Sequence, residues 1–351
     1  CDLIDSAGDY IDIVKLAFFQ DEHAWCQKRF ALVNDLGVDV VFTHVSPEYI
    51  PAVWGRYAPG VRAVFNLPSY VDDGLVAAAE RFALPEELRD IDVGYRGRAL
   101  PPHMGAGSQE KRVIGERFRE LARGRGVPLR LDIETSEDSR IYGDDWYRFL
   151  GRSKATLGVE SGVSFMDLED ECLEEYLAYR RRGVEPTLEQ LQAGALGRWD
   201  GNIPYRTLGP RHFEAAAFRV CQVLFEGDYS GAMEPMVHYL PLAKDFSNFD
   251  DVVAGLHDPA LRRRLTERAH ADLIASGRYR YERLIERVDE ELLRAGVEPD
   301  AEAAERRALA QALRRGALGR RVRREARRPG STAQRLVYRV VAPISLRIRR
   351  R

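Results

Sequence analysis

The sequence predicts an α/β protein built on parallel sheets. Short apolar runs alternate with amphipathic stretches through residues 11–80, and the same alternation returns between residues 91 and 225. Strands that alternate with helices are typical of a parallel sheet covered by helices. A chain of 351 residues with 45% hydrophobic content is also long enough for two domains with their own cores.

Residues 1–85 are expected to form the first of these domains. Its apolar runs predict strands at 14–19, 38–44 and 61–66, with helices at 22–35 and 46–57 between them. Residues 82–90 are polar and contain Pro85, which favours a linker to the next domain.

Residues 90–295 are expected to form the second domain. Strands are predicted at 91–95, 129–133, 155–159 and 221–225, and helices at 108–124, 143–152, 258–275 and 278–294. An acidic insertion at 165–205 is expected to hold two helices. Thr187, with Gln190 three residues later, has the capping-box pattern that opens the second of them.

The net charge of −2 conceals a strong asymmetry. Residues 306–351 contain sixteen arginines and a single acid, Glu325, so this tail carries +15 and the rest of the chain −17. The tail surrounds an apolar patch at 336–346, which suits an anionic membrane surface better than specific nucleic-acid binding. A tail that only improves solubility has the same composition.

Cysteine usage and hydropathy bound the compartment. Cys1, Cys26, Cys172 and Cys221 lie far apart without a CxxC pair, so we expect neither a zinc site nor a disulfide framework. No run of about 18 apolar residues occurs. The expectation is a cytoplasmic protein, at most peripheral on the inner face of the plasma membrane. The start at Cys1 leaves an upstream segment open.

The segment 209–228 holds the strongest functional signal. Pro210 suits the first position of a helix, where no N–H donor is needed. The free N–H groups of that first turn, with Gly209, Arg211 and His212 beside them, predict a phosphate site. Glu214 lies one turn deeper, where a carboxylate can accept hydrogen bonds from ribose hydroxyls. A phosphate site beside an acid for the sugar is the chemistry of a nucleotide-sugar pocket.

This segment resembles the donor-site helix of group-1 glycosyltransferases of the GT-B fold, and more closely that of the spore-protein CgeB-like glycosyltransferases. The likeness implies two Rossmann-like domains that face each other across a cleft, the second of which holds the donor. Three strand–helix units are about half of a usual GT-B N-terminal domain, so we expect this domain to be shortened or incomplete. The matching segments are 210–231, 238–253 and 268–290, with weaker likeness at 91–98, 137–146 and 155–162.

One position departs from the group-1 pattern. The pattern places a second acid eight residues before the helix glutamate, and this chain has Arg206 there. Sugar contacts made by that acid therefore do not carry over, and the retaining stereochemistry that the resemblance implies is left open.

Cations after strand 91–95 are candidates for the diphosphate. Ligands of open α/β sheets bind beyond the carboxyl ends of the strands, and Arg96 and Arg98 stand there. Arginine can hold a phosphate bidentately and stabilise it as it leaves. Lys111 resembles the lysine that group-1 enzymes use beside the diphosphate. Surface cations on a loop are the alternative interpretation.

Two further loops are expected to line the pocket. Glu160 ends the strand 155–159, and a glycine-containing loop follows the strand 221–225. A strand that ends in an ordinary polar turn gives the same sequence in both places. The residues expected from the second loop are Glu226, Gly227, Asp228, Tyr229 and Ser230.

Asp21 and His23, which follow the first strand, are candidates for the base that activates an acceptor hydroxyl. A helix-capping aspartate and a surface histidine would explain these two residues equally well.

No metal site is expected. Asp90-Ile91-Asp92 is formally a DxD motif, but it precedes a strand and reads as acidity of the linker. We therefore expect metal-independent chemistry, with no cofactor and with a nucleoside diphosphate sugar as co-substrate.

Three functions remain open at this point. The first is transfer of a sugar to a hydroxyl of a bacterial surface polysaccharide, glycolipid or coat component. The second is a non-catalytic module of degenerate GT-B fold that binds a sugar nucleotide or a membrane partner. The third is a nucleotide-sugar epimerase, which would need a second acid–base group over the sugar.

Overall fold

The computed structural model describes residues 14–297 and has an α/β fold with parallel sheets, as the sequence predicts. The arginine-rich tail at 306–351, for which a membrane role is expected, lies outside the described residues. One compact unit spans residues 16–285. Within residues 14–297, none of the helices has the length and apolar character needed to cross a membrane.

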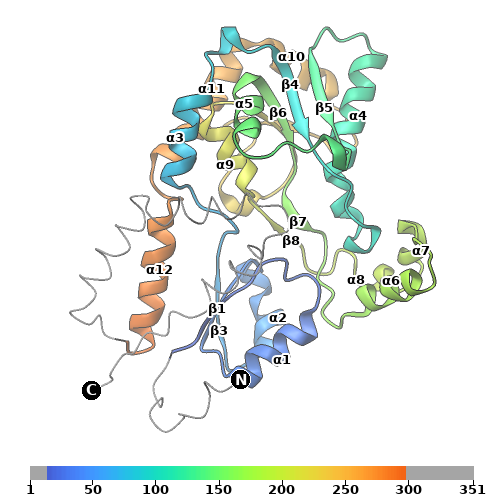
Figure 1. Cartoon of the computed structure of the whole chain (residues 1–351), viewed down its shortest axis with the longest axis vertical. Coiled ribbons are helices and arrows are strands. Elements are labelled where there is room, and N and C mark those ends of the chain that lie inside the picture. The colour runs from blue at the N-terminus through green and yellow to red at the C-terminus, as the bar shows by residue number, and fades with distance from the viewer. Residues whose placement is uncertain (1–13, 298–351) are drawn as a thin grey trace. The chain divides into compact units, whose positions relative to one another are not determined.

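The first sheet has three parallel strands in the order β1-β2-β3. Figure 1 labels its strands β1 and β3 and the helices α1 and α2 beside them. Its four β2 residues are all buried, which matches the continuous apolar run in the sequence. The strands are β1 (Leu16–Phe18), β2 (Val40–Thr43) and β3 (Arg62–Phe65), connected by the helices α1 (Cys26–Leu36) and α2 (Ile50–Tyr57).

The second sheet has five parallel strands in the order β10-β9-β6-β4-β5. The strands are β4 (Ile91–Arg96), β5 (Leu131–Glu134), β6 (Ser153–Gly158), β9 (Cys221–Phe225) and β10 (Leu240–Leu242). The accompanying helices are α3 (Asp73–Phe82), α4 (Glu110–Gly124), α5 (Asp144–Arg152), α9 (Pro210–Ala217), α10 (Phe249–His257) and α11 (Pro259–His270). Helix α12 (Tyr281–Arg294) comes after them in the chain.

Helix α3 was not predicted, although its start carries a clear signal. The Asp72 carboxylate accepts a hydrogen bond from the backbone N–H of Leu75 at 2.6 Å, the geometry of a helix N-cap. Leu75 and Ala79 join the core that contains Phe213 and Ala215 of α9. The last helix of the predicted first domain therefore packs with the helices of the second sheet.

The predicted insertion holds three helices rather than two: α6 (Glu171–Arg181), α7 (Leu188–Gln192) and α8 (Leu196–Trp199). The capping box at the start of α7 is confirmed, since Thr187 and Gln190 exchange side-chain and backbone hydrogen bonds. An unpredicted antiparallel pair, β7 (Ser161–Val163) and β8 (Tyr205–Thr207), encloses the insertion. Residues of this pair and of the insertion, including Met166, pack into the core of the first sheet.

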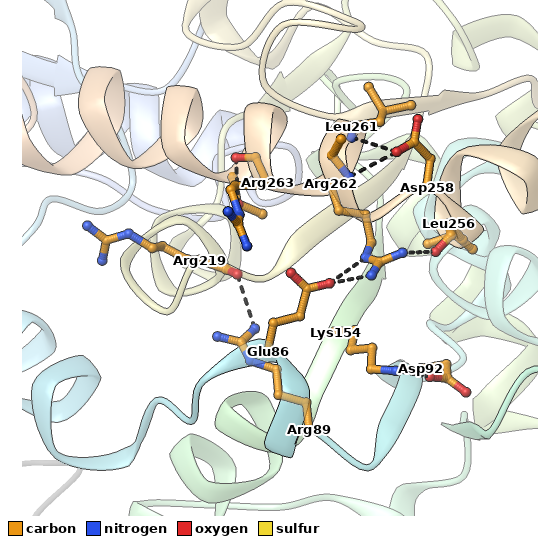
Figure 2. A network of polar contacts seen from close by, with 12 residues as sticks. Glu86, Arg89, Asp92, Lys154, Arg219, Leu256, Asp258, Leu261, Arg262 and Arg263 are labelled. Carbon is orange, nitrogen blue, oxygen red and sulfur yellow. Dashed lines mark hydrogen bonds and ion pairs between the residues drawn. The ribbon is translucent and has the colours of Figure 1, made fainter.

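Arg89 joins three separate segments beneath the second sheet. Its buried guanidinium donates hydrogen bonds to the carbonyls of Leu84, Ser153, Phe218 and Arg219 at 2.9–3.1 Å. The bond to the Arg219 carbonyl is drawn in Figure 2. Two of these carbonyls follow the end of α9, where a helix leaves acceptors without partners. One side chain therefore connects the end of helix α9 to the start of β6.

Candidate functional site

A cavity of about 530 Å³ lies at the carboxyl ends of β4, β6 and β9, where ligands of open α/β sheets bind. The segments that line it are the end of β4 with the loop after it, the loop before α5, the end of β6, and the first turns of α9. Predicted site residues on its wall are Arg96, Arg98, Lys111, Arg211, His212 and Glu214.

The start of α9 is shaped by one close approach. An added Cβ at Gly209 would lie 1.9 Å from the Ser161 hydroxyl oxygen, so any larger residue would force the Ser161 side chain to move. Pro210 follows at the first helical position. The Nδ1 atom of His212 accepts a hydrogen bond from the Gly209 N–H at 3.0 Å, which caps the helix. Burial lowers the pKa of His212 to about 4, so its ring is neutral at neutral pH.

Glu214 lies on the cavity wall and is half-buried. Its Oε2 atom accepts a hydrogen bond from the indole N–H of Trp146 at 2.9 Å. The guanidinium of Arg211 stacks over the same indole, 4.9 Å from the ring centroid. Burial raises the pKa of Glu214, and Trp146 and Arg211 oppose that rise. Arg211 and Glu214 are neighbours on α9, and the fold brings the distant Trp146 to both of them.

Within residues 14–297, Arg98 and Lys111 are cations without side-chain partners. Neither side chain has a hydrogen bond or an ion pair with any residue of 14–297, although both line the cavity. Burial lowers the pKa of Lys111, and the positive charges of Arg98 and Arg211 lower it further. Three cations that repel one another at the mouth of a cavity form an electropositive site for an anion.

Arg96 behaves differently from Arg98. Its Nη2 atom forms an ion pair with Asp132 at 2.8 Å, and its Nη1 atom donates to the carbonyls of Tyr95 and Asp132. Its guanidinium also stacks on Phe149. The side chain is on the cavity wall, but most of its donors hold the edge of the sheet.

The structure brings Glu160 and the loop 226–231 together, away from the cavity wall. Oε1 of Glu160 accepts hydrogen bonds from the N–H groups of Asp228 and Tyr229 at 3.2 and 3.0 Å. A Cβ added to Gly227 would lie 2.7 Å from that carboxylate. Ser230 instead bonds Thr207 at 2.9 Å. Glu226 and Asp228 are exposed, and none of the side chains from this loop lines the 530 Å³ cavity.

Arg206, the residue that departs from the group-1 pattern, is bound by an acid from another element. It donates to both carboxylate oxygens of Glu110 at 2.7 and 3.0 Å, and lies 3.7 Å from Glu160. Lys244 donates to Glu110 at 2.9 Å. Although burial opposes it, these two cations lower the pKa of Glu110. The arginine is thus neutralised within the fold.

Asp21 and His23 belong to a separate group of side chains after β1. Their neighbour Glu22 is buried and accepts hydrogen bonds from the Thr43 hydroxyl and the His44 N–H, both at 2.6 Å, and from the Tyr205 hydroxyl at 3.2 Å. Burial raises the pKa of Glu22 to about 7, against the effect of these donors.

Two buried imidazoles complete this group. The rings of His23 and His44 lie 5.8 and 6.4 Å from the Tyr205 ring, and neither Nδ1 atom has a hydrogen-bond partner among the described residues. Burial lowers the pKa of both to about 4. A neutral imidazole with a free nitrogen can accept a hydrogen bond from a hydroxyl group.

The sequence interpretation missed Trp146, Glu22 and His44. Trp146 stands in the segment 137–146, which carries the weaker likeness, but the sequence predicted no role for its indole. His44 directly follows the buried strand β2, whereas His23 comes five residues after the end of β1. Polar residues after each strand of a parallel sheet are the signal that would have found it.

The DxD motif lies at the other end of β4 from the cavity. Asp90 pairs with Arg152, and Asp92 is held by Arg130 and Lys154. Within residues 14–297, no three His, Cys, Asp or Glu side chains come together in a way that could hold a metal ion.

No protein-family model matches the chain, and no curated protein matches it in sequence. Solved structures with partial similarity include TarM, with a TM-score of 0.42 at 11% identity. The match covers 79% of this chain but only 50% of the TarM chain. Anabaena HepE in complex with UDP-glucose has a TM-score of 0.41 at 11% identity, with 79% of this chain and 71% of that chain covered. A glycosyltransferase from Rickettsia africae has a TM-score of 0.44 at 9% identity, with 80% and 70% covered.

Proposed function

We propose that the chain is a glycosyltransferase of the GT-B, CgeB-like type that transfers a sugar from a nucleoside diphosphate to a hydroxyl acceptor. The observation that carries the proposal is the cavity at the carboxyl ends of β4, β6 and β9. It combines a half-buried helix carboxylate, Glu214, with Arg98 and Lys111, two cations that have no partner within residues 14–297. A carboxylate for the ribose hydroxyls beside free cations for the phosphates is the arrangement of charges that suits a sugar nucleotide.

In this proposal Glu214 accepts hydrogen bonds from the ribose hydroxyls. Arg98, Lys111 and Arg211 bind the diphosphate and stabilise the negative charge that develops as it leaves. Arg96 lies at the end of β4 on the cavity wall, but its guanidinium is already paired with Asp132. The chemistry uses no metal ion, and the sugar nucleotide is the only small molecule it consumes besides the acceptor.

The acceptor side of the proposal rests on the group after β1. The free Nδ1 atom of His23 is buried beside Tyr205, and a hydroxyl that enters there would satisfy it. Asp21 lies two residues before His23 and is exposed, and its charge raises the pKa of His23 against the effect of burial. In this proposal either side chain can accept the proton of the acceptor hydroxyl. Glu160 and the loop 226–231 are assigned to support the fold around the donor rather than to contact it.

A panel of sugar nucleotides tests the proposal. We expect the wild type to bind at least one member and to release its nucleoside diphosphate when a hydroxyl acceptor is present. Glu214→Ala should abolish binding while the fold is retained, as judged by circular dichroism. Wild-type affinity in that variant would remove the main support.

The products separate the rival functions. A changed sugar that stays attached to the nucleotide supports an epimerase, and binding without release of the diphosphate supports a non-catalytic module.

Glu171→Ala is a suitable control for Glu214→Ala. Glu171 also accepts a hydrogen bond from a tryptophan indole, at 2.8 Å, but it lies in the insertion.

A further inference from the structure

A second polar cavity lies at the amino ends of the strands of the five-stranded sheet. It has a volume of about 300 Å³ and is walled by the starts of β4 and β6, the loop before β5, the end of α10 and the first turn of α11. Since β4 and β6 run from this cavity to the donor cavity, the two sites lie at opposite ends of the same strands. The charged or titratable side chains on its wall are Asp92, Arg130, Lys154, His257 and Arg262.

Cations outnumber carboxylates on this wall. Asp92 is the one carboxylate among the lining residues, and it is shared by two cations. The Lys154 ammonium donates to its Oδ1 atom at 2.8 Å, and Arg130 donates to Oδ1 and Oδ2 at 3.0 and 3.1 Å. The three side chains together therefore carry a charge of one positive unit.

Arg262 neutralises two negative groups near this cavity, the Glu86 carboxylate and the carboxyl end of α10. Its Nε atom donates to Glu86 at 2.8 Å, so this second nearby carboxylate is already paired (Figure 2). Its Nη1 atom donates to the carbonyl of Leu256 in the last turn of α10, where the helix dipole is negative. The arginine thus covers a carboxylate and a helix end.

Donors remain available on this wall, from the half-buried Lys154 and the exposed Arg130. The Lys154 ammonium has three N–H groups, of which one is used by Asp92. The Nη1 atom of Arg130 has no hydrogen-bond partner among residues 14–297, since its other nitrogens make the bonds to Asp92 and to the Arg89 carbonyl. His257, which is exposed, adds a ring nitrogen at the rim.

We infer that this cavity, lined by Lys154, Arg130 and Arg262, is a binding site for a phosphate group, either as free phosphate or as part of a small phosphorylated metabolite. A phosphate group has more acceptor oxygens than a carboxylate and carries more negative charge than a chloride ion, so it can accept hydrogen bonds from several of these cations at once. The inference is independent of the donor cavity and of the function proposed for it.

Calorimetric titration of the full chain with inorganic phosphate tests the inference, with ionic strength held constant by chloride. The wild type should bind phosphate, and Lys154→Gln should weaken binding about tenfold because a charge-assisted hydrogen bond is lost. Lys154→Arg should restore it. Asp92 stays paired with Arg130 in both variants, so the fold is expected to be kept.

Two controls locate the site. Arg152→Gln removes a neighbouring cation that pairs with exposed Asp90 outside the cavity, and it should bind phosphate as the wild type does. Arg98→Gln, in the donor cavity, should also leave this affinity unchanged. No phosphate binding to the wild type, or a loss caused by Arg98→Gln or Arg152→Gln instead of Lys154→Gln, would overturn the inference. A parallel titration with glucose 6-phosphate shows which form is preferred: tighter binding that is also lost in Lys154→Gln assigns the site to a phosphorylated metabolite.

Discussion

The indole N–H of Trp146 donates a hydrogen bond of 2.9 Å to the carboxylate of Glu214, and both residues line the 530 Å³ cavity. This bond leaves the second carboxylate oxygen for a ligand. The indole also carries the stacked Arg211 guanidinium on its face. One tryptophan therefore orients both the acid proposed for ribose and a cation proposed for phosphate.

Trp146→Phe is expected to weaken nucleotide binding about tenfold, because it removes the donor to Glu214 and keeps a ring for Arg211. Titration with UDP, GDP and ADP measures the change. Since the Trp146 bond opposes the rise in the pKa of Glu214, the loss should be larger at acidic pH. Trp199→Phe removes an equivalent indole bond, to Glu171, and should leave nucleotide affinity as it is.

Arg206→Glu is expected to destabilise the fold by about 3–5 kcal/mol, because Glu110 and Glu160 would then face a third acid in a half-buried site. The double variant Arg206→Glu, Glu110→Arg, in which the two charges are swapped, should recover part of this loss. Urea denaturation of the two single variants and the double variant measures the coupling. Additive effects would show that the pair does not interact in the folded protein.

Glu22 predicts a pH-dependent term in stability. Its pKa rises from 4.5 to about 7 on folding, so its contribution is present below pH 4.5 and is lost as pH rises through 7. The stability of the wild type relative to Glu22→Gln should therefore fall between these values, by on the order of 3 kcal/mol. Chemical denaturation at several pH values gives this difference curve.

His44 predicts a term of the opposite sign. Its pKa falls from 6.5 to about 4 on folding, so its contribution is present above pH 6.5 and is lost as the pH falls to 4. The stability of the wild type relative to His44→Asn should therefore rise with pH. Curves of equal slope for the Glu22 and His44 variants would contradict both assignments.

Gly209→Ala is expected to cost about 1–3 kcal/mol, because the new methyl group would overlap the Ser161 hydroxyl. Adding Ser161→Gly should recover most of the loss, which thermal denaturation can measure. Gly124→Ala provides the comparison. A Cβ at Gly124, at the end of α4, meets no atom within 4 Å, so that variant should be neutral or slightly stabilising.

The sequence predicted best what local chemistry decides. Pro210 marked the start of α9, and Thr187 with Gln190 marked the start of α7, because each signal acts within a single turn. The apolar runs of β2 and β9 were visible because parallel strands are buried on both faces. Helix α3 was missed beside a segment read as a linker, even though Asp72 supplied its cap.

The site was harder to predict, because its contacts join distant residues. Nothing near Arg96 in the sequence shows that Asp132 takes up its guanidinium, while Arg98 two residues later stays free. Likewise, Glu160 and Asp228 are separated by a helical insertion, a strand pair and α9. Only the register of β6 beside β9 places that carboxylate under the loop amides.

The position of Arg89 has a consequence for how a ligand is received. Its guanidinium ties the end of α9 to the start of β6, so tilting the helix would leave a buried cation and several carbonyls without partners. The wall formed by α9 is therefore rigid before any ligand arrives. A molecule that enters must match a preformed surface, and selectivity on this side comes from shape and charge fixed at folding rather than from a helix that swings inward.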